Sequence, residues 1–189
     1  MNRQTGFSLV EMAIVLTAFG LMMGGMLVPL AKQSRFQKER EAKRQLAVIT
    51  EALYGYALIH ETLPGPVGKD TLPWQALGVP ETDPWGRPWR YRTAPKTNPC
   101  DPGNDIRVRD EKGALAAQVT AVVVSEGRFR YDSGAERENR DGDADFVKAF
   151  PRPERFDDVV AWVNPAVLKN RAVLAGLCAK DGAESGQGG

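Results

Sequence analysis

The chain has 189 residues, of which 25 are basic and 24 acidic, so its formal net charge at pH 7 is only +1. This balance lacks the basic excess of nucleic-acid-binding proteins, and we expect no nucleic acid among its partners. His60 is the single histidine, which leaves histidine-based triads and zinc sites short of ligands and argues against an enzyme. The length leaves room for one domain beyond an N-terminal segment.

The first thirty residues hold the most informative pattern. A short polar leader ends at Gly6, the run Phe7-Ser8-Leu9-Val10-Glu11 follows, and residues 12–31 contain no charge. An apolar stretch of this length can cross a bilayer as a helix. Glu11 is anomalous at the start of such a helix, because a carboxylate there is costly unless a positive charge pairs with it.

This order of features resembles the N-terminal signal of type IV pilins and type II secretion pseudopilins. The resemblance implies that prepilin peptidase cuts between Gly6 and Phe7 and that Phe7 is then N-methylated. It also implies that Glu11 pairs with the terminal ammonium of a neighbouring subunit during assembly, which would relieve two buried charges at once. A secretory signal peptide would have a shorter apolar core and a different cleavage site. A plain single-pass anchor would leave Glu11 and the Gly6-Phe7 junction unexplained.

One long helix is predicted from about Ser8 to about Ile59. Residues 32–44 contain no glycine or proline, and an apolar stripe at helical spacing follows them, formed by Leu46, Ile49, Leu53 and Tyr56. Such a stripe would dock onto a globular domain. We therefore expect a leader (1–6), a transmembrane or filament-core helix (7–31), its amphipathic continuation (32–60), a globular pilin-like domain (61–180) and a disordered tail (181–189).

The rest of the chain predicts a small sheet. Asp83-Pro84-Trp85-Gly86-Arg87-Pro88-Trp89 is similar to a motif of major pseudopilins that leads from the helix into the sheet. Strands are expected at 89–93, 106–109, 119–125, 129–132 and 156–163, with 119–124 at the centre. Asn164-Pro165 predicts the start of a last helix over 166–177. The predicted fold class is α+β, a long N-terminal helix packed on a small antiparallel sheet, as in pilins.

Two cysteines, Cys100 and Cys178, would lie outside the cytoplasm in a pilin-like orientation, where oxidation is permitted. A disulfide between them is expected, and it would stabilise the fold by about 4–5 kcal/mol in the chain-entropy model. Two unpaired buried thiols are the alternative.

Alternating carboxylates at Asp141, Asp143 and Asp145 form the one candidate metal site, because they can surround a hard cation when the loop bends at glycine. The stretch 143–146 resembles the calcium-binding loop of major pseudopilins, which implies calcium as a ligand. Arg137 and Arg140 crowd this loop, so a solvated acidic loop is the alternative.

These features predict a non-enzymatic filament subunit in the bacterial inner membrane, with one membrane pass and a periplasmic C-terminal domain. The basic residues of 32–44 run against the positive-inside rule in this orientation, which therefore rests on the resemblance. The 83–89 motif and the acidic loop favour a type II secretion pseudopilin, whose partners are prepilin peptidase and other subunits. The length and the cysteine pair favour a minor pilin of a type IV pilus. A membrane-anchored periplasmic binding domain that does not polymerise is the second alternative.

Overall fold

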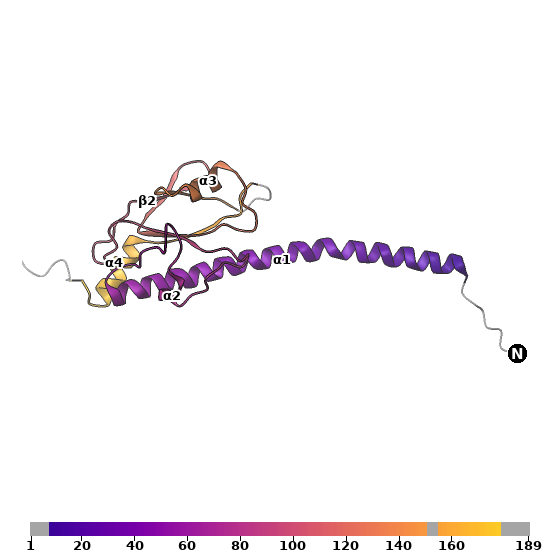
Figure 1. Cartoon of the computed structure of the whole chain (residues 1–189), viewed down its shortest axis with the longest axis horizontal. Helices are drawn as coiled ribbons and strands as arrows, with labels where there is room; N and C mark the ends of the chain where they lie inside the picture. Colours follow the sequence, from indigo (N-terminus) through magenta and orange to yellow (C-terminus); the bar gives the residue numbers. More distant parts are fainter. Residues whose placement is uncertain (1–7, 151–154, 179–189) are drawn as a thin grey trace, which may run out of the picture. The chain divides into compact units, whose positions relative to one another are not determined.

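The computed structural model describes residues 8–150 and 155–178, without the side chains of 23–35 (Figure 1). It has four helices, α1 (Leu9–His60), α2 (Trp74–Leu77), α3 (Gly134–Asp141) and α4 (Pro165–Leu174). Its six strands are β1 (Arg90–Thr93), β2 (Ile106–Asp110), β3 (Leu115–Val119), β4 (Ala121–Ser125), β5 (Asp145–Lys148) and β6 (Val159–Val163). The chain divides into two compact units, with the boundary between Lys38 and Glu39.

α1 begins and ends close to the predicted limits. Its first turn is closed by a capping box, because Val10 N–H donates to Ser8 Oγ (3.3 Å) and Ser8 N–H donates to Glu11 Oε2 (3.2 Å). After His60 the chain turns away through Glu61, which has a left-handed φ of 56°.

The globular unit contains two three-stranded sheets. The order of the first is β1-β4-β6 and all its pairs are antiparallel, whereas the second, β3-β2-β5, pairs β2 with β5 in parallel. β4 is central and buried along its whole length. Its alternate side chains enter two cores, Ala121 and Val123 the core shared with α1, Val122 and Val124 the core shared with the second sheet.

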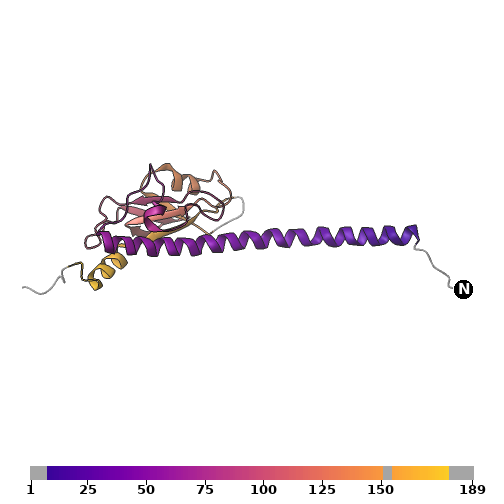
Figure 2. The same cartoon turned by 60° about the horizontal axis from the view of Figure 1, so that its bottom comes forward.

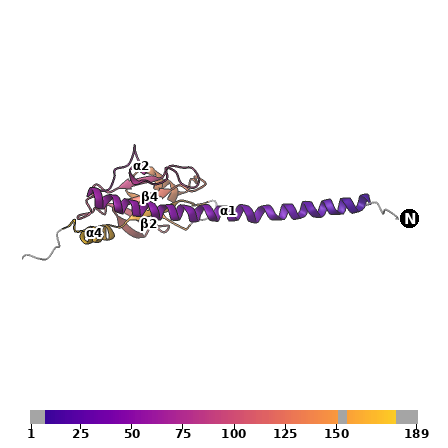
Figure 3. The same ribbon diagram turned by 90° about the horizontal axis from the view of Figure 1, so that it is seen from below.

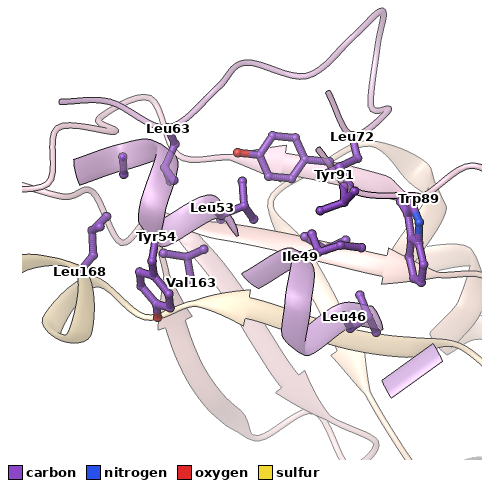
Figure 4. Close-up of a cluster of buried hydrophobic side chains, with 14 of the residues drawn as sticks. Leu46, Ile49, Leu53, Tyr54, Leu63, Leu72, Trp89, Tyr91, Val163 and Leu168 are labelled. Carbon is purple, nitrogen blue, oxygen red and sulfur yellow. The ribbon is translucent and has the colours of Figure 1, made fainter. Parts of the chain in front are cut away.

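The larger core lies between α1 and the first sheet (Figure 4). Leu46, Ile49 and Leu53 are buried there, as the predicted stripe requires, while Tyr56 is half-buried and stacks on His60 with ring centroids 4.0 Å apart. Trp89 Nε1–H donates to the Pro80 carbonyl (3.1 Å), and Tyr91 O–H donates to the Pro64 carbonyl (3.0 Å). Buried aromatic side chains therefore fix the proline-rich connection.

α4 starts at the predicted cap, where Asn164 Oδ1 accepts hydrogen bonds from Ala166 N–H and Val167 N–H. Asn164 N–H in turn donates to the Tyr54 hydroxyl of α1 (2.9 Å). The Arg171 guanidinium donates two hydrogen bonds to the Glu51 carboxylate, so α4 lies beside the C-terminal end of α1, as Figures 2 and 3 show.

The α+β class is confirmed, but several predicted elements differ. The expected strand 119–125 is two strands, β3 and β4, because Thr120 interrupts them and its hydroxyl donates to the Gly103 carbonyl (2.8 Å). Residues 129–132 form no strand, since Phe129 N–H is taken by an Asp157 carboxylate oxygen. β6 begins only at Val159, α4 ends at Leu174, and α2, α3 and β5 were not predicted. The predicted tail 181–189 lies outside the described residues.

Candidate functional site

The segment of α1 from Leu9 to Met22 exposes large apolar side chains on all its faces. The exposed fraction is 89% for Leu9, 63% for Ile14 and 76% for Leu21. The hydroxyl of Thr17 donates to the Ala13 carbonyl (2.7 Å), so the one polar side chain that follows Glu11 in this run has its hydrogen-bond partner within the helix. Monomeric soluble proteins rarely expose so large a continuous apolar surface, and this segment therefore needs an apolar partner.

Glu11 lies at the start of this apolar surface and is itself exposed. Its Oε2 accepts the Ser8 N–H, whereas its Oε1 accepts no hydrogen bond from any described residue. The carboxylate can therefore close the helix and still pair with a cation brought by another molecule. Gly6 and Phe7, the predicted processing site, lie outside the described residues.

The predicted metal ligands are only partly brought together. Carboxylate oxygens of Asp143 and Asp145 lie within 4.8 Å of one another and of Glu138, and Asp141 is not in this group. Asp141 instead ends α3, where its Oδ1 accepts the Asp143 N–H (3.0 Å). At this loop, the carboxylates close enough to share a cation are therefore Glu138, Asp143 and Asp145.

Asp145 already has positive partners, because Arg107 Nε–H (2.8 Å) and Arg109 Nε–H (3.1 Å) both donate to its Oδ1. The hydrogen bond from Arg107 is the main cause that holds the pKa of Asp145 below its usual value. A cation at this loop would compete with these two guanidinium groups.

A second carboxylate group, which the sequence did not reveal, is buried between α3 and the start of β6. Glu136, Asp157 and Asp158 are 0%, 8% and 3% exposed, and one oxygen of each lies within 4.8 Å of the others. Glu136 Oε1 accepts the Asp157 N–H (2.9 Å), and Asp157 Oδ2 accepts the N–H groups of Arg128 and Phe129 (2.8 Å each). Glu136 Oε2 and Asp157 Oδ1 are buried and accept nothing from the described residues.

This burial makes the charged forms costly. Desolvation raises the pKa of Glu136 to about 7 and that of Asp158 to about 7, although Asn139 Nδ2–H donates to Asp158 Oδ2 (2.9 Å). Desolvation also raises the pKa of Asp157. The raised pKa values of Glu136 and Asp158 favour protonated forms up to near neutral pH.

The close approach of the Asp157 backbone depends on Gly127. A Cβ at this position would lie 2.4 Å from the Asp157 carbonyl oxygen, and the φ of Gly127 is +61°. Ser133-Gly134-Ala135-Glu136 has the spacing of a capping box, with Glu136 N–H donating to Ser133 Oγ (3.3 Å). This pattern could have identified α3 in the sequence, but nothing local places Glu136 beside Asp157.

The motif that begins at Asp83 forms a hydrogen-bonded clip on β4. Asp83 Oδ1 accepts the N–H groups of Trp85 and Arg87 (2.9 Å each), and Oδ2 accepts the Ser125 hydroxyl (2.6 Å). Arg87 donates to the carbonyls of Glu126 (3.1 Å) and Arg128 (2.8 Å). The turn therefore fixes the end of the central strand.

Cys100 and Cys178 form a disulfide, with 5.5 Å between their Cα atoms. It joins the loop before β2 to the segment that follows α4. The C-terminal end of the described chain is therefore covalently attached to the globular unit.

The chain matches the family model of the prokaryotic N-terminal methylation motif over residues 1–27. Comparisons with curated proteins and with solved structures gave no match. The motif is the signal of type IV pilins and pseudopilins, and the resemblance read from Gly6, Phe7 and Glu11 is confirmed.

The motif, together with the α+β fold, supports a type IV pilin-like subunit, and proteins of that class are structural rather than enzymatic. The motif implies processing by prepilin peptidase and assembly with other pilin-like subunits. Within the part of the chain that is described, no helix is long and apolar enough to span a membrane.

Proposed function

We propose that this chain is a type II secretion pseudopilin, a subunit of an inner-membrane filament that drives protein export. The observation that carries the filament role is the uncovered apolar surface of α1 that follows the Ser8–Glu11 cap. In a bundle of such helices each surface would be covered by its neighbours, and Glu11 would meet the ammonium of a processed Phe7. The globular unit would then lie on the periplasmic side.

The Asp83 clip supports the choice of a secretion pseudopilin, because it holds the stretch that is similar to major pseudopilins onto the central strand. The disulfide between Cys100 and Cys178 supports the competing reading, a minor pilin of a type IV pilus. A deletion in the native bacterium distinguishes the two. We expect loss of exported proteins from the medium with surface pili retained, and restoration by the wild-type chain.

Loss of pili with normal secretion would instead assign the chain to a pilus. If neither process changed, the remaining reading would be an anchored periplasmic domain that does not polymerise.

Glu11→Ala tests the role of the carboxylate in assembly. The variant should be inserted and largely cleaved, because a membrane carboxylate is removed, yet it should enter filaments poorly beside wild-type subunits. Glu39→Ala, a control on the same helix, should assemble normally, since Glu39 is paired within the helix with Lys43. Equal incorporation of the Glu11 variant, measured in sheared filaments, would contradict an assembly role.

Calcium binding at Asp143 and Asp145 is also proposed, now with Glu138 in place of Asp141 as the third ligand. Millimolar calcium should raise the Tm by binding the native state, and magnesium should do much less. Asp143→Ala should abolish the calcium response and leave the calcium-free Tm nearly unchanged. If the calcium-dependent rise in Tm survives Asp143→Ala but disappears in Glu136→Gln, calcium binds instead at the buried carboxylate group. If calcium does not change the Tm at all, the loop is solvated acidic surface that binds no calcium.

A further inference from the structure

A hollow of about 640 Å³ on the globular unit is lined by four arginines and two aspartates, namely Arg90, Arg130, Arg137, Arg140, Asp132 and Asp141. We call it the arginine hollow. A second hollow of about 420 Å³ adjoins it, since Arg90 and Arg130 line both. Asp70 and Glu126, which line the second hollow, pair with Arg90 and Arg130, so the arginine hollow is a cluster of guanidinium groups whose charge is partly balanced.

The guanidinium groups of Arg90 and Arg130 are held in place by one buried carboxylate, that of Glu126. Glu126 has a side chain only 4% exposed, and it accepts hydrogen bonds from both Arg90 and Arg130. Burial would raise the pKa of Glu126, but the hydrogen bonds from Arg130 and Arg90 hold it below its usual value. Glu126 is therefore an anion that fixes two cations at the floor of the hollow.

Arg90 Nη1 is paired with Asp70, and Arg140 Nη2 donates to the Tyr131 carbonyl (2.8 Å), so the donors still open to a ligand are those of Arg130 and Arg137. The Arg130 side chain is 56% exposed, and its terminal nitrogens donate to no described residue. Arg137 is 65% exposed, and its Nε lies 3.6 Å from Asp132 Oδ1, too far for a good hydrogen bond. Lys69 and Arg92 extend the positive surface beside Gly142, at the C-terminal end of α3.

We propose that the arginine hollow binds an acidic segment of a partner protein, whose carboxylates accept hydrogen bonds from Arg130 and Arg137. Guanidinium groups bind carboxylates through paired N–H donors, and Glu126 already orients that of Arg130. Asp132 and Asp141 on its wall would repel a densely charged phosphate chain, whereas a peptide of mixed acidic and neutral residues can avoid them. The inference concerns the globular unit and holds whichever filament the chain serves.

Fluorescence anisotropy tests it, with the full chain in detergent and a labelled peptide of alternating glutamate and serine. Arg130→Ala and Arg137→Ala should each weaken binding about fivefold or more, since each removes a charge-assisted contact. The control is Lys96→Ala, which removes an equal charge from a side chain that is 69% exposed and lies outside the hollow. It should change the affinity less than about twofold at physiological salt, where distant surface charges are screened.

Unchanged melting curves would show that the arginine variants are folded. The proposal is overturned if the wild-type chain does not bind the peptide, or if Lys96→Ala weakens binding as much as Arg137→Ala. It is also overturned if inorganic phosphate displaces the peptide at concentrations where acetate does not, or if an oligonucleotide of equal charge binds more tightly.

Discussion

Among single residues, Glu136 and Asp158 have the least ordinary electrostatic surroundings. Both side chains are buried, and this burial raises their pKa values. A neighbouring carboxylate raises each pKa further, whereas Arg140 lowers each of them. The charge of Glu126 adds to the rise in the pKa of Asp158, and that of Arg87 reduces the rise in the pKa of Asp157. The folded state therefore binds protons more tightly than the unfolded chain does.

This difference predicts how stability depends on pH. Because the pKa of Glu136 rises from 4.5 to about 7 on folding, the folded state is penalised increasingly as pH rises through that interval. The Tm should therefore increase by a few degrees between about pH 8 and pH 5. At lower pH the trend should reverse, since Glu51, Glu126 and Asp145 have lowered pKa values and lose their arginine partners when protonated.

Glu136→Gln provides the control for the pH dependence. The amide oxygen can still accept the Asp157 N–H, but the side chain no longer titrates, so the slope between pH 5 and pH 8 should flatten. A wild-type Tm that falls steadily over the same interval would show that the carboxyl group is not proton-binding.

At the scale of helices and strands, the sequence predicted the elements whose formation depends on residues close together in the chain. α1 follows from the continuous apolar run of its first half and the apolar stripe of its last turns, and the start of α4 follows from Asn164 and Pro165. The break at Thr120 and the parallel pairing of β5 with β2 depend on contacts between distant segments, which a single sequence does not show. For the same reason the order of residues predicts a processing site at Gly6 and Phe7 and a role for Glu11, but it gave no sign of the buried carboxylate group that includes Glu136.

The Asp83 clip gives a prediction at this scale. Asp83→Ala removes one buried carboxylate that accepts three hydrogen bonds, two from backbone N–H groups and one from Ser125. The free energy of unfolding should fall by about 2–4 kcal/mol. Denaturation followed by tryptophan fluorescence measures this loss. Asp101→Ala, in which the lost side chain is 82% exposed, should cost less than about 0.5 kcal/mol, and equal losses would contradict the role of the clip.

At the scale of the whole molecule, the disulfide links residues 78 positions apart. Closing a loop of this length restricts the unfolded chain, so reduction should lower the free energy of unfolding by about 2–5 kcal/mol. The comparison is a denaturation curve with and without reductant. A double variant, Cys100→Ser with Cys178→Ser, should start at the lower stability and be insensitive to reductant. Equal stability of the oxidised wild type and the double variant would contradict a stabilising bond.

The central claim is that the chain is a processed, pilin-like subunit, and intact-mass and N-terminal mass spectrometry of the protein from its native membrane tests it most directly. We predict a mature chain that begins with N-methylated Phe7, because the methylation motif covers residues 1–27. Gly6 replaced by a bulky residue should leave the unprocessed precursor. An intact Met1, or a chain cut after Ala31, would contradict the account.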